Sequence, residues 1–200
     1  MVGGDRKLVG ALTSLLVLGS LALAGCATDA SAAVQGEYPD LTLAASKSPV
    51  QLLRNDAAGR IPPAVIETVE ETLDESVSCL EESDDPDGTI RSWHSSAVVT
   101  LGSDSAWRVE SVVDKLVASY TDQDWVARSL GQTADFRSSL LTNKSTKAEI
   151  QIIGQRPDKD QVSTSTEENV DVVTIEIQVH GPCVRTPGAT SDEVLKLEGK

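Results

Sequence analysis

Apolar residues recur along this chain in two rhythms, one with spacings of three and four residues and one of strict alternation. The first rhythm is expected for the buried face of a helix and the second for a strand with one buried face. Ser48 and Pro49 form a typical helix start, because a serine hydroxyl caps free N–H groups and proline fits the first turn. We therefore expect a short helix that ends at Gly59.

Residues 63–73 are expected to form a second helix, opened by Pro62 and Pro63. The apolar side chains in and after this segment fall at helical spacing, at Ile66, Val69, Leu73, Val77 and Leu80. Residues 74–81 also partly fit an alternating pattern. For that stretch, helix, strand and loop all stay open.

The rest of the chain predicts one more helix and several strands. Residues 103–105 can cap a helix whose apolar stripe ends at Tyr120. Residues 156–168 are polar and loop-like. Strict alternation is clearest in the last strand, where Val173, Ile175, Ile177 and Val179 share one face. The expected strands are 93–101, 125–130, 136–142, 148–154 and 170–181.

These elements predict a single α+β domain over residues 47–186. Strands that are apolar on one face favour an antiparallel sheet, here of about four to five strands, with helices packed on that face as a two-layer sandwich. The chain has 3 Trp, 2 Tyr and 1 Phe, so its core must consist mainly of Val, Leu and Ile. Residues 187–200 are expected as an exposed tail with a fragment of helix at 192–197.

The first 25 residues have the three parts of an export signal. Arg6 and Lys7 give a positive start, residues 8–23 an apolar middle, and small residues close it before Cys26. The apolar stretch has about sixteen residues, fewer than the roughly twenty that span a bilayer. The order Leu-Ala-Gly-Cys at 23–26 is typical of a bacterial lipobox, in which the cysteine is lipidated and begins the mature protein. An uncleaved membrane anchor and a secretory signal cut near residues 30–33 are the alternatives.

Lipidation of Cys26 predicts a protein attached to the extracytoplasmic face of the cell membrane. A diacylated cysteine supplies the two chains that stable attachment needs. Residues 26–46 are small and polar, which favours a flexible tether. The chain has 17 basic and 31 acidic residues; without Asp5, Arg6 and Lys7 these become 15 and 30, a net charge of about −15. Such a surface repels nucleic acid and anionic lipid head groups, so neither is an expected partner and the lipid must provide the attachment.

Once Cys26 is assigned to the lipid, Cys79 and Cys183 remain as an even pair. In an oxidising compartment the expected outcome is a disulfide between them. Two separate buried thiols are the alternative. The disulfide would tie the start of the domain to its last strand.

Several stretches together resemble uncharacterised lipoproteins of high-GC Gram-positive bacteria. They are LAGC at 23–26, SPVQLLRNDAAGRIP at 48–62, RSWHSSAVVTL at 91–101, the helix that ends before Asp124-Trp125, and GPC at 181–183. The resemblance covers most of the chain after the signal. It implies a small lipid-anchored envelope domain with a disulfide, and it implies no activity.

The sequence contains none of the motifs that identify common enzyme sites. It lacks HExxH, a phosphate-binding glycine loop, the GxSxG elbow and a dinucleotide fingerprint. With only two histidines, a three-histidine zinc site is excluded, and no cofactor is expected. His94 and His180 alternate with apolar strand positions, so we interpret them as ordinary surface residues on the polar face.

The acidic turn at Asp84, Asp85 and Asp87 is the one metal candidate. Read as an EF-hand loop, it would have Ser83 where the first carboxylate is needed and His94 where the bidentate glutamate is needed. A solvated acidic turn is the favoured interpretation, and weak divalent-cation binding is the alternative.

Trp93, Trp107 and Trp125 allow two interpretations. A solvent-facing row of tryptophans would favour a sugar-binding platform, whereas burial would make them core residues. Burial is the favoured interpretation.

Three functions from different classes follow. The favoured one is a non-catalytic envelope lipoprotein that acts through contacts with other envelope proteins or as an accessory to a membrane complex. The alternative is a lipoprotein that binds a small ligand or glycan, which requires a concave pocket lined by tryptophan or by residues of the polar strand face. A hydrolase is the least favoured, because it requires a cleft that brings a histidine near paired carboxylates.

Overall fold

The computed structural model describes residues 40–102, 108–121, 123–156 and 172–200, all within one compact unit that spans residues 37–200. The predicted signal, Cys26 and the tether as far as residue 39 lie outside the described residues. So do the predicted cap at 103–105, Trp107 and most of the predicted loop 156–168.

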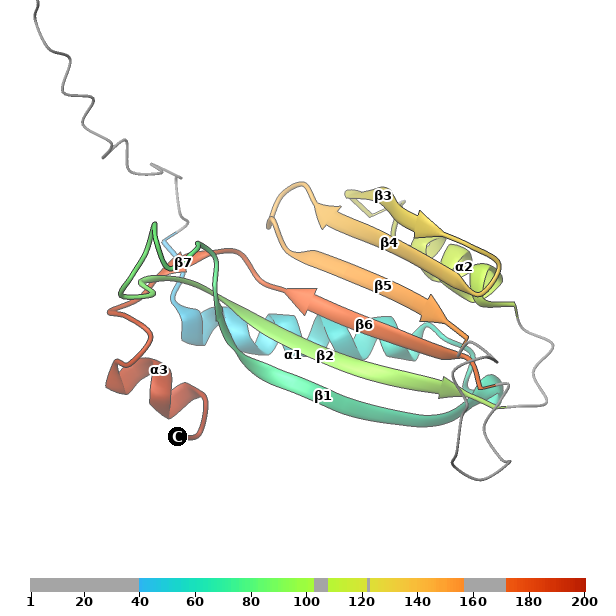
Figure 1. Cartoon of the computed structure of the whole chain (residues 1–200), viewed down its shortest axis with the longest axis horizontal. Helices are drawn as coiled ribbons and strands as arrows, with labels where there is room; N and C mark the ends of the chain where they lie inside the picture. Colours follow the sequence, from blue (N-terminus) through green and yellow to red (C-terminus); the bar gives the residue numbers. More distant parts are fainter. Residues whose placement is uncertain (1–39, 103–107, 122, 157–171) are drawn as a thin grey trace, which may run out of the picture. The chain divides into compact units, whose positions relative to one another are not determined.

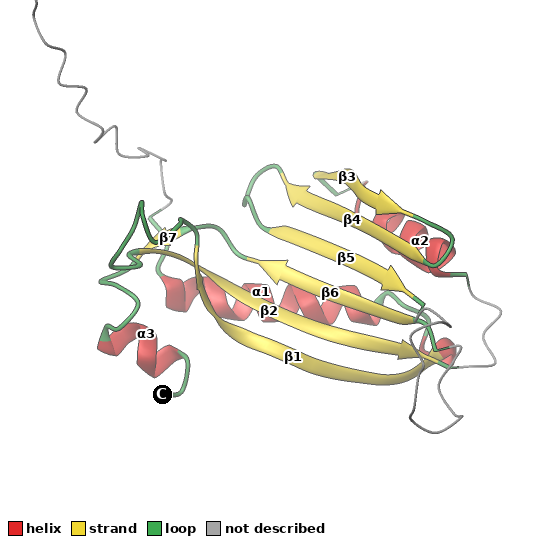
Figure 2. Ribbon diagram, in the orientation of Figure 1, coloured by secondary structure: helices red, strands yellow, loops and turns green. Residues whose placement is uncertain are grey.

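The described residues form an α+β fold with one antiparallel sheet (Figures 1 and 2). The sheet order is β1-β2-β6-β5-β4-β3, with β7 paired to the end of β2. The class is confirmed, but the described sheet has seven strands rather than four or five. The elements are α1 (Leu43–Gly59), β1 (Ile66–Ser78), β2 (Ile90–Leu101), α2 (Val109–Thr121), β3 (Trp125–Gln132), β4 (Phe136–Asn143), β5 (Glu149–Gln155), β6 (Thr174–His180), β7 (Val184–Arg185) and α3 (Asp192–Leu197).

The helix predicted over residues 63–73 is wrong, because β1 occupies this segment after a 3-10 turn at Pro63–Val65. Two register shifts interrupt its pairing with β2 and break the alternation of side chains that identifies a strand. Val69 therefore pairs with Val99, whereas Leu73 pairs with Ser96 on the opposite face. Apolar residues four apart suggest one helical face in the sequence, but the bulge places them on two sides of an edge strand. The open stretch 74–78 is strand.

Helix α1 begins earlier than predicted and continues through Pro49. The hydroxyl of Thr42, rather than that of Ser48, caps it and accepts a hydrogen bond from the Ala45 N–H at 3.1 Å. Leu43 is fully buried, so residues 43–46, which were expected in the tether, belong to the folded domain. The predicted end at Gly59 is confirmed.

The chain's last residues are not the exposed tail that was predicted. The expected helix at 192–197 is present as α3, and its Val194 is fully buried. The ammonium group of Lys47 donates a hydrogen bond to the Leu197 carbonyl at 2.7 Å, and the Ser76 hydroxyl donates one to the Glu198 carboxylate. These partners are more than a hundred residues away in sequence, so local patterning could not reveal them.

The core lies where the helices meet the sheet. Helix α1 packs on β2 and β6, and α2 packs on β4 and β5, as Figure 1 shows. Fully buried strand residues alternate along β2, β5 and β6, as period-two patterning requires. They are Val99, Leu101, Ile150, Ile152, Ile175, Ile177 and Val179.

The predicted disulfide between Cys79 and Cys183 is confirmed, with the two Cα atoms 6.1 Å apart. It joins the end of β1 to the segment after β6, across a sequence separation of 104 residues. Closing so long a loop restricts the unfolded chain, which the chain-entropy model values at up to about 4.7 kcal/mol.

Gly154 provides a test of the packing between α2 and the sheet. A Cβ atom at this position would lie 2.6 Å from Val113 Cγ2 and 2.8 Å from Val109 Cγ1. Valine side chains are stiff, so Gly154→Ala should lower the free energy of unfolding by about 1–3 kcal/mol. Gly59→Ala is the matched control, because nothing lies within 4 Å of its added Cβ. Urea unfolding measures the free energy of unfolding of both variants. Equal losses in Gly154→Ala and Gly59→Ala would contradict this packing.

Candidate functional site

Strand register places a row of polar side chains across one face of the sheet. His94 on β2 pairs with His180 on β6, and His180 pairs with Glu149 on β5. The row extends to Glu75 on β1 and to Thr142 on β4. We call the sheet face that carries this row the histidine face.

The two histidines stack on each other, with ring centroids 3.9 Å apart and an interplanar angle of 24°. Their predicted place on the polar face is confirmed, but they are half-buried rather than ordinary surface residues. The His94 Nε2 atom is enclosed and has no hydrogen-bond partner among the described residues. Burial, with a smaller effect from His180, lowers the pKa of His94 to about 4. Burial also lowers the pKa of His180, against an opposing effect of Glu149.

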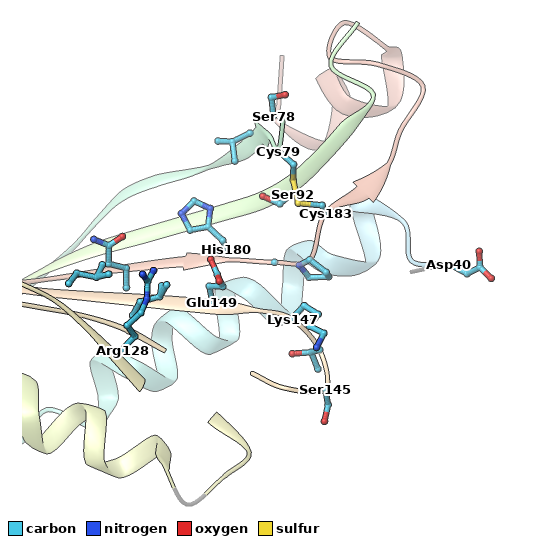
Figure 3. A pocket seen from close by; sticks show the side chains of 17 residues that line it. Asp40, Ser78, Cys79, Ser92, Arg128, Ser145, Lys147, Glu149, His180 and Cys183 are labelled. Carbon is cyan, nitrogen blue, oxygen red and sulfur yellow. A yellow bond between two sulfur atoms is a disulfide. The ribbon is translucent and has the colours of Figure 1, made fainter. Parts of the chain in front are cut away.

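A groove of about 1110 Å³ lies on the histidine face (Figure 3). Its volume is slightly larger than the roughly 300–1,000 Å³ found for small-molecule sites. Strands β1 to β6 contribute to its lining, together with the disulfide and the turn between β4 and β5. The lining includes Val77, Ser92, Arg128, Leu130, Leu140, Lys147, Glu149, Gln151 and His180.

The polar groups of the groove come from different elements and differ in charge. Arg128 lies on the edge strand β3, Lys147 in the turn before β5, and Glu149 and Gln151 on β5. Figure 3 shows Glu149 beside His180 in the middle of the groove, with Asp40 apart from both. The arrangement offers hydrogen-bond donors and acceptors along a partly apolar channel, as recognition of a small polar molecule requires.

The Cys79–Cys183 disulfide lines the groove together with Pro182. In Figure 3 it lies beside Ser78 and Ser92. The cross-link therefore fixes part of the wall of the groove, in addition to tying β1 to the segment after β6.

The acidic turn uses its central carboxylate for its own structure. One oxygen of Asp85 accepts hydrogen bonds from the N–H and the hydroxyl of Thr89, both at 2.9 Å, and the other accepts the Ile90 N–H at 2.7 Å. These bonds, chiefly the one from the Thr89 N–H, lower the pKa of Asp85. The described part of the chain contains no group of three or more His, Cys, Asp or Glu placed to hold a metal ion.

Both described tryptophans are core residues. Trp93 is fully buried, its indole N–H donates to the Asp74 carboxylate at 2.8 Å, and the Lys47 ammonium lies 4.3 Å from its ring centroid. Trp125 is buried and makes an edge contact with Tyr120 at 5.5 Å between centroids. The interpretation as core residues is confirmed for these two, and the proposed sugar-binding platform is wrong for them.

Sequence reasoning did not identify the groove. Arg128, Leu140, Glu149 and Gln151 belong to strands whose neighbours in the sheet are set by topology, which no local pattern reveals. The available signal was the set of polar positions that alternate with apolar ones along each strand. It marks the candidate face but not the part of it that is hollowed.

Comparison with protein-family models, with curated proteins and with solved structures returned no match. None of the helices in the described residues combines the length and the apolarity needed to cross a bilayer. Cys26, the predicted lipidation residue, lies outside the described residues.

The stacked histidines should make stability fall in mild acid. The unfolded chain takes up a proton at His94 near pH 6.5, whereas the fold resists protonation until about pH 4. The free energy of unfolding should therefore fall as the pH drops below 6.5, and level off below about 4. Between pH 7 and pH 5 we expect a loss of about 1 kcal/mol from this residue, allowing for its partial exposure.

Urea unfolding of His94→Gln and of the wild type at each pH checks this. The variant should lose part of the slope between pH 7 and pH 5. Gln178→Ala, on the neighbouring strand and the same face, is the control and should keep the wild-type slope. An unchanged slope in His94→Gln would contradict the buried neutral imidazole.

Proposed function

We propose that this protein is a lipid-anchored extracytoplasmic module that binds a small ligand in the groove on the histidine face. The observation that carries the proposal is the groove itself, with polar strand residues and a half-buried histidine in its lining. A concave pocket lined by residues of the polar strand face is the feature that separates a ligand-binding lipoprotein from one that acts through protein contacts alone.

We also infer that α1 and α2 share one face of the sheet and leave the histidine face open. Arg54 of α1 donates a hydrogen bond to Ser95, which points away from the neighbouring His94 side chain. Val113 of α2 lies against Gly154, next to Ile153, which shares the histidine face by register. Such a two-layer arrangement keeps one side of the sheet accessible to a ligand.

Membrane attachment through Cys26 remains part of the proposal. Its support is the Leu-Ala-Gly-Cys order at the end of an apolar stretch, and the polar residues that separate it from α1. A tether of this kind would hold the folded domain near the membrane surface and leave the groove open to the envelope.

The free edge of β3 favours a second candidate function, contact with another envelope protein. Val126 and Leu130 on this strand are 49% and 42% exposed, and β3 ends the order of the described sheet. An edge strand with exposed apolar residues can add a strand from a partner. Catalysis is not proposed: the carboxylates in the described lining of the groove are those of Asp40 and Glu149, and Figure 3 shows Asp40 apart from Glu149 and His180.

Replacing the lipidation residue tests the anchor. Cys26→Ser should leave an unprocessed precursor that carries no acyl chain, because the modified thiol is gone. Metabolic labelling with a fatty acid and the electrophoretic mobility of the protein measure this. Labelling of the wild type and of Cys79→Ser/Cys183→Ser, but not of Cys26→Ser, is the expected result. A Cys26→Ser variant that is processed and labelled like the wild type would contradict the proposal.

Filling the groove tests the ligand site. Gln151 is half-buried in the groove, so Gln151→Trp should occupy its volume, whereas Thr174→Trp places the same side chain on the histidine face outside it. Ligand-observed NMR with a mixture of monosaccharides, aromatic carboxamides and aromatic carboxylates reports binding. We expect Gln151→Trp to lose at least about tenfold in affinity, and Thr174→Trp to match the wild type. Equal binding by both variants would show that the groove is not the site.

A further inference from the structure

We propose that the ligand of this groove is an elongated organic anion whose carboxylate is bound by Arg128. This inference rests on the proposed function, since it names the chemical class that the groove would take. It follows from the pairing state of the arginines, from the distribution of charge along the groove, and from the strand register.

Arg128 differs from most arginines of the fold because its guanidinium has no partner among the described residues. Arg54 lies 2.6 Å from Glu71, Arg60 2.8 Å from Asp56, and Arg137 2.7 Å from Asp114. A fourth, Arg91, donates to the hydroxyl and carbonyl of Ser76. By contrast, Arg128 makes no ion pair or hydrogen bond within the described part of the chain, although it lines the groove.

The chain has a net charge of −14, so a guanidinium in the groove without a carboxylate partner among the described residues is unexpected. Acidic partners are abundant on such a surface, yet none pairs with this side chain among the described residues. A planar guanidinium binds a carboxylate through two parallel hydrogen bonds, so a free one in a concave site is suited to an anionic ligand. Lys147 adds a second positive charge to the lining, while its ammonium donates to the Lys144 carbonyl at 2.8 Å.

The negative charge of the groove's lining comes from Glu149 and Asp40. Glu149 is on β5, its carboxylate accepts the Thr142 hydroxyl at 3.2 Å, and it pairs across the strands with His180. Asp40 lies apart from Glu149 and His180 in Figure 3. A ligand with one carboxylate at the β3 side fits these charges, whereas a second anionic group over β5 would be repelled by the Glu149 carboxylate.

Register defines the path of the rest of the ligand. Arg128 on β3 pairs with Leu140 on β4, which pairs with Gln151 on β5, and all three line the groove. Neighbouring strands are about 4.8 Å apart, so the row from β3 to β5 spans roughly 10 Å. In order from the carboxylate, the ligand meets the aliphatic side chain of Leu140 and then the amide group of Gln151. It is therefore elongated, apolar next to its carboxylate and hydrogen-bonding farther on.

Two probes of equal shape isolate the charge. Biphenyl-4-carboxylate and biphenyl-4-carboxamide have the same biphenyl group, but the first ends in a charged carboxylate and the second in a neutral amide. Titration calorimetry of the purified full chain should show the carboxylate binding at least about tenfold tighter, because a charge-assisted pair contributes more than a neutral one. Arg128→Gln should remove this preference, so that the two probes bind within about twofold of each other, and Arg128→Lys should keep part of it.

Arg108→Gln is the matched control, since it makes the same substitution and the same change of charge at an exposed position paired with Glu110. It should keep the wild-type preference. If the wild type binds the two probes equally and Gln151→Trp binds neither, the inference of an anionic ligand is overturned. The groove would then still be a binding site. A carboxylate preference that survives in Arg128→Gln would overturn the role of Arg128. Probe binding that Gln151→Trp leaves intact would overturn the proposed function itself.

Discussion

The antiparallel pairing of β2 with its neighbours is the interaction on which the rest of the structure depends. This strand pairs with β1 along one edge and with β6 and β7 along the other, and α1 packs on it. The partner β6 arrives more than seventy residues later in the chain, after α2 and the meander of β3, β4 and β5. Without that long-range pairing, the β1–β2 hairpin and the meander would be two separate small sheets. Neither would enclose the core that both now share.

The same pairing builds the candidate site. His94, His180 and Glu149 form one row only because β2, β6 and β5 align in a single register. A slip of one residue would turn every side chain of a strand to the other face. The apolar faces of β5 and β6 oppose such a slip, since Ile152 and Ile177 are fully buried beneath the row. Burial on one face therefore fixes the chemistry displayed on the other.

Elements with an uninterrupted pattern could be predicted from the sequence, as β6, α2 and the Cys79–Cys183 pair show. Interrupted patterns were misleading, because the bulges in β1 imitate a helical spacing and Pro49 conceals the true start of α1. The groove could not be foreseen, since the proximity of Arg128 to Gln151 depends on strand order. The unpaired state of a guanidinium is likewise a property of three-dimensional contacts, which composition does not record.

The cross-link has a further consequence, for the response of the folded domain to proteolysis. Cys79 and Cys183 enclose β2, α2, β3, β4, β5 and β6 in one covalent ring. A single peptide bond broken anywhere between residues 80 and 182 leaves both pieces joined through the sulfur bridge. After such a cut, the strands that carry the two histidines therefore stay covalently connected. Without the disulfide, the two fragments would be free to dissociate.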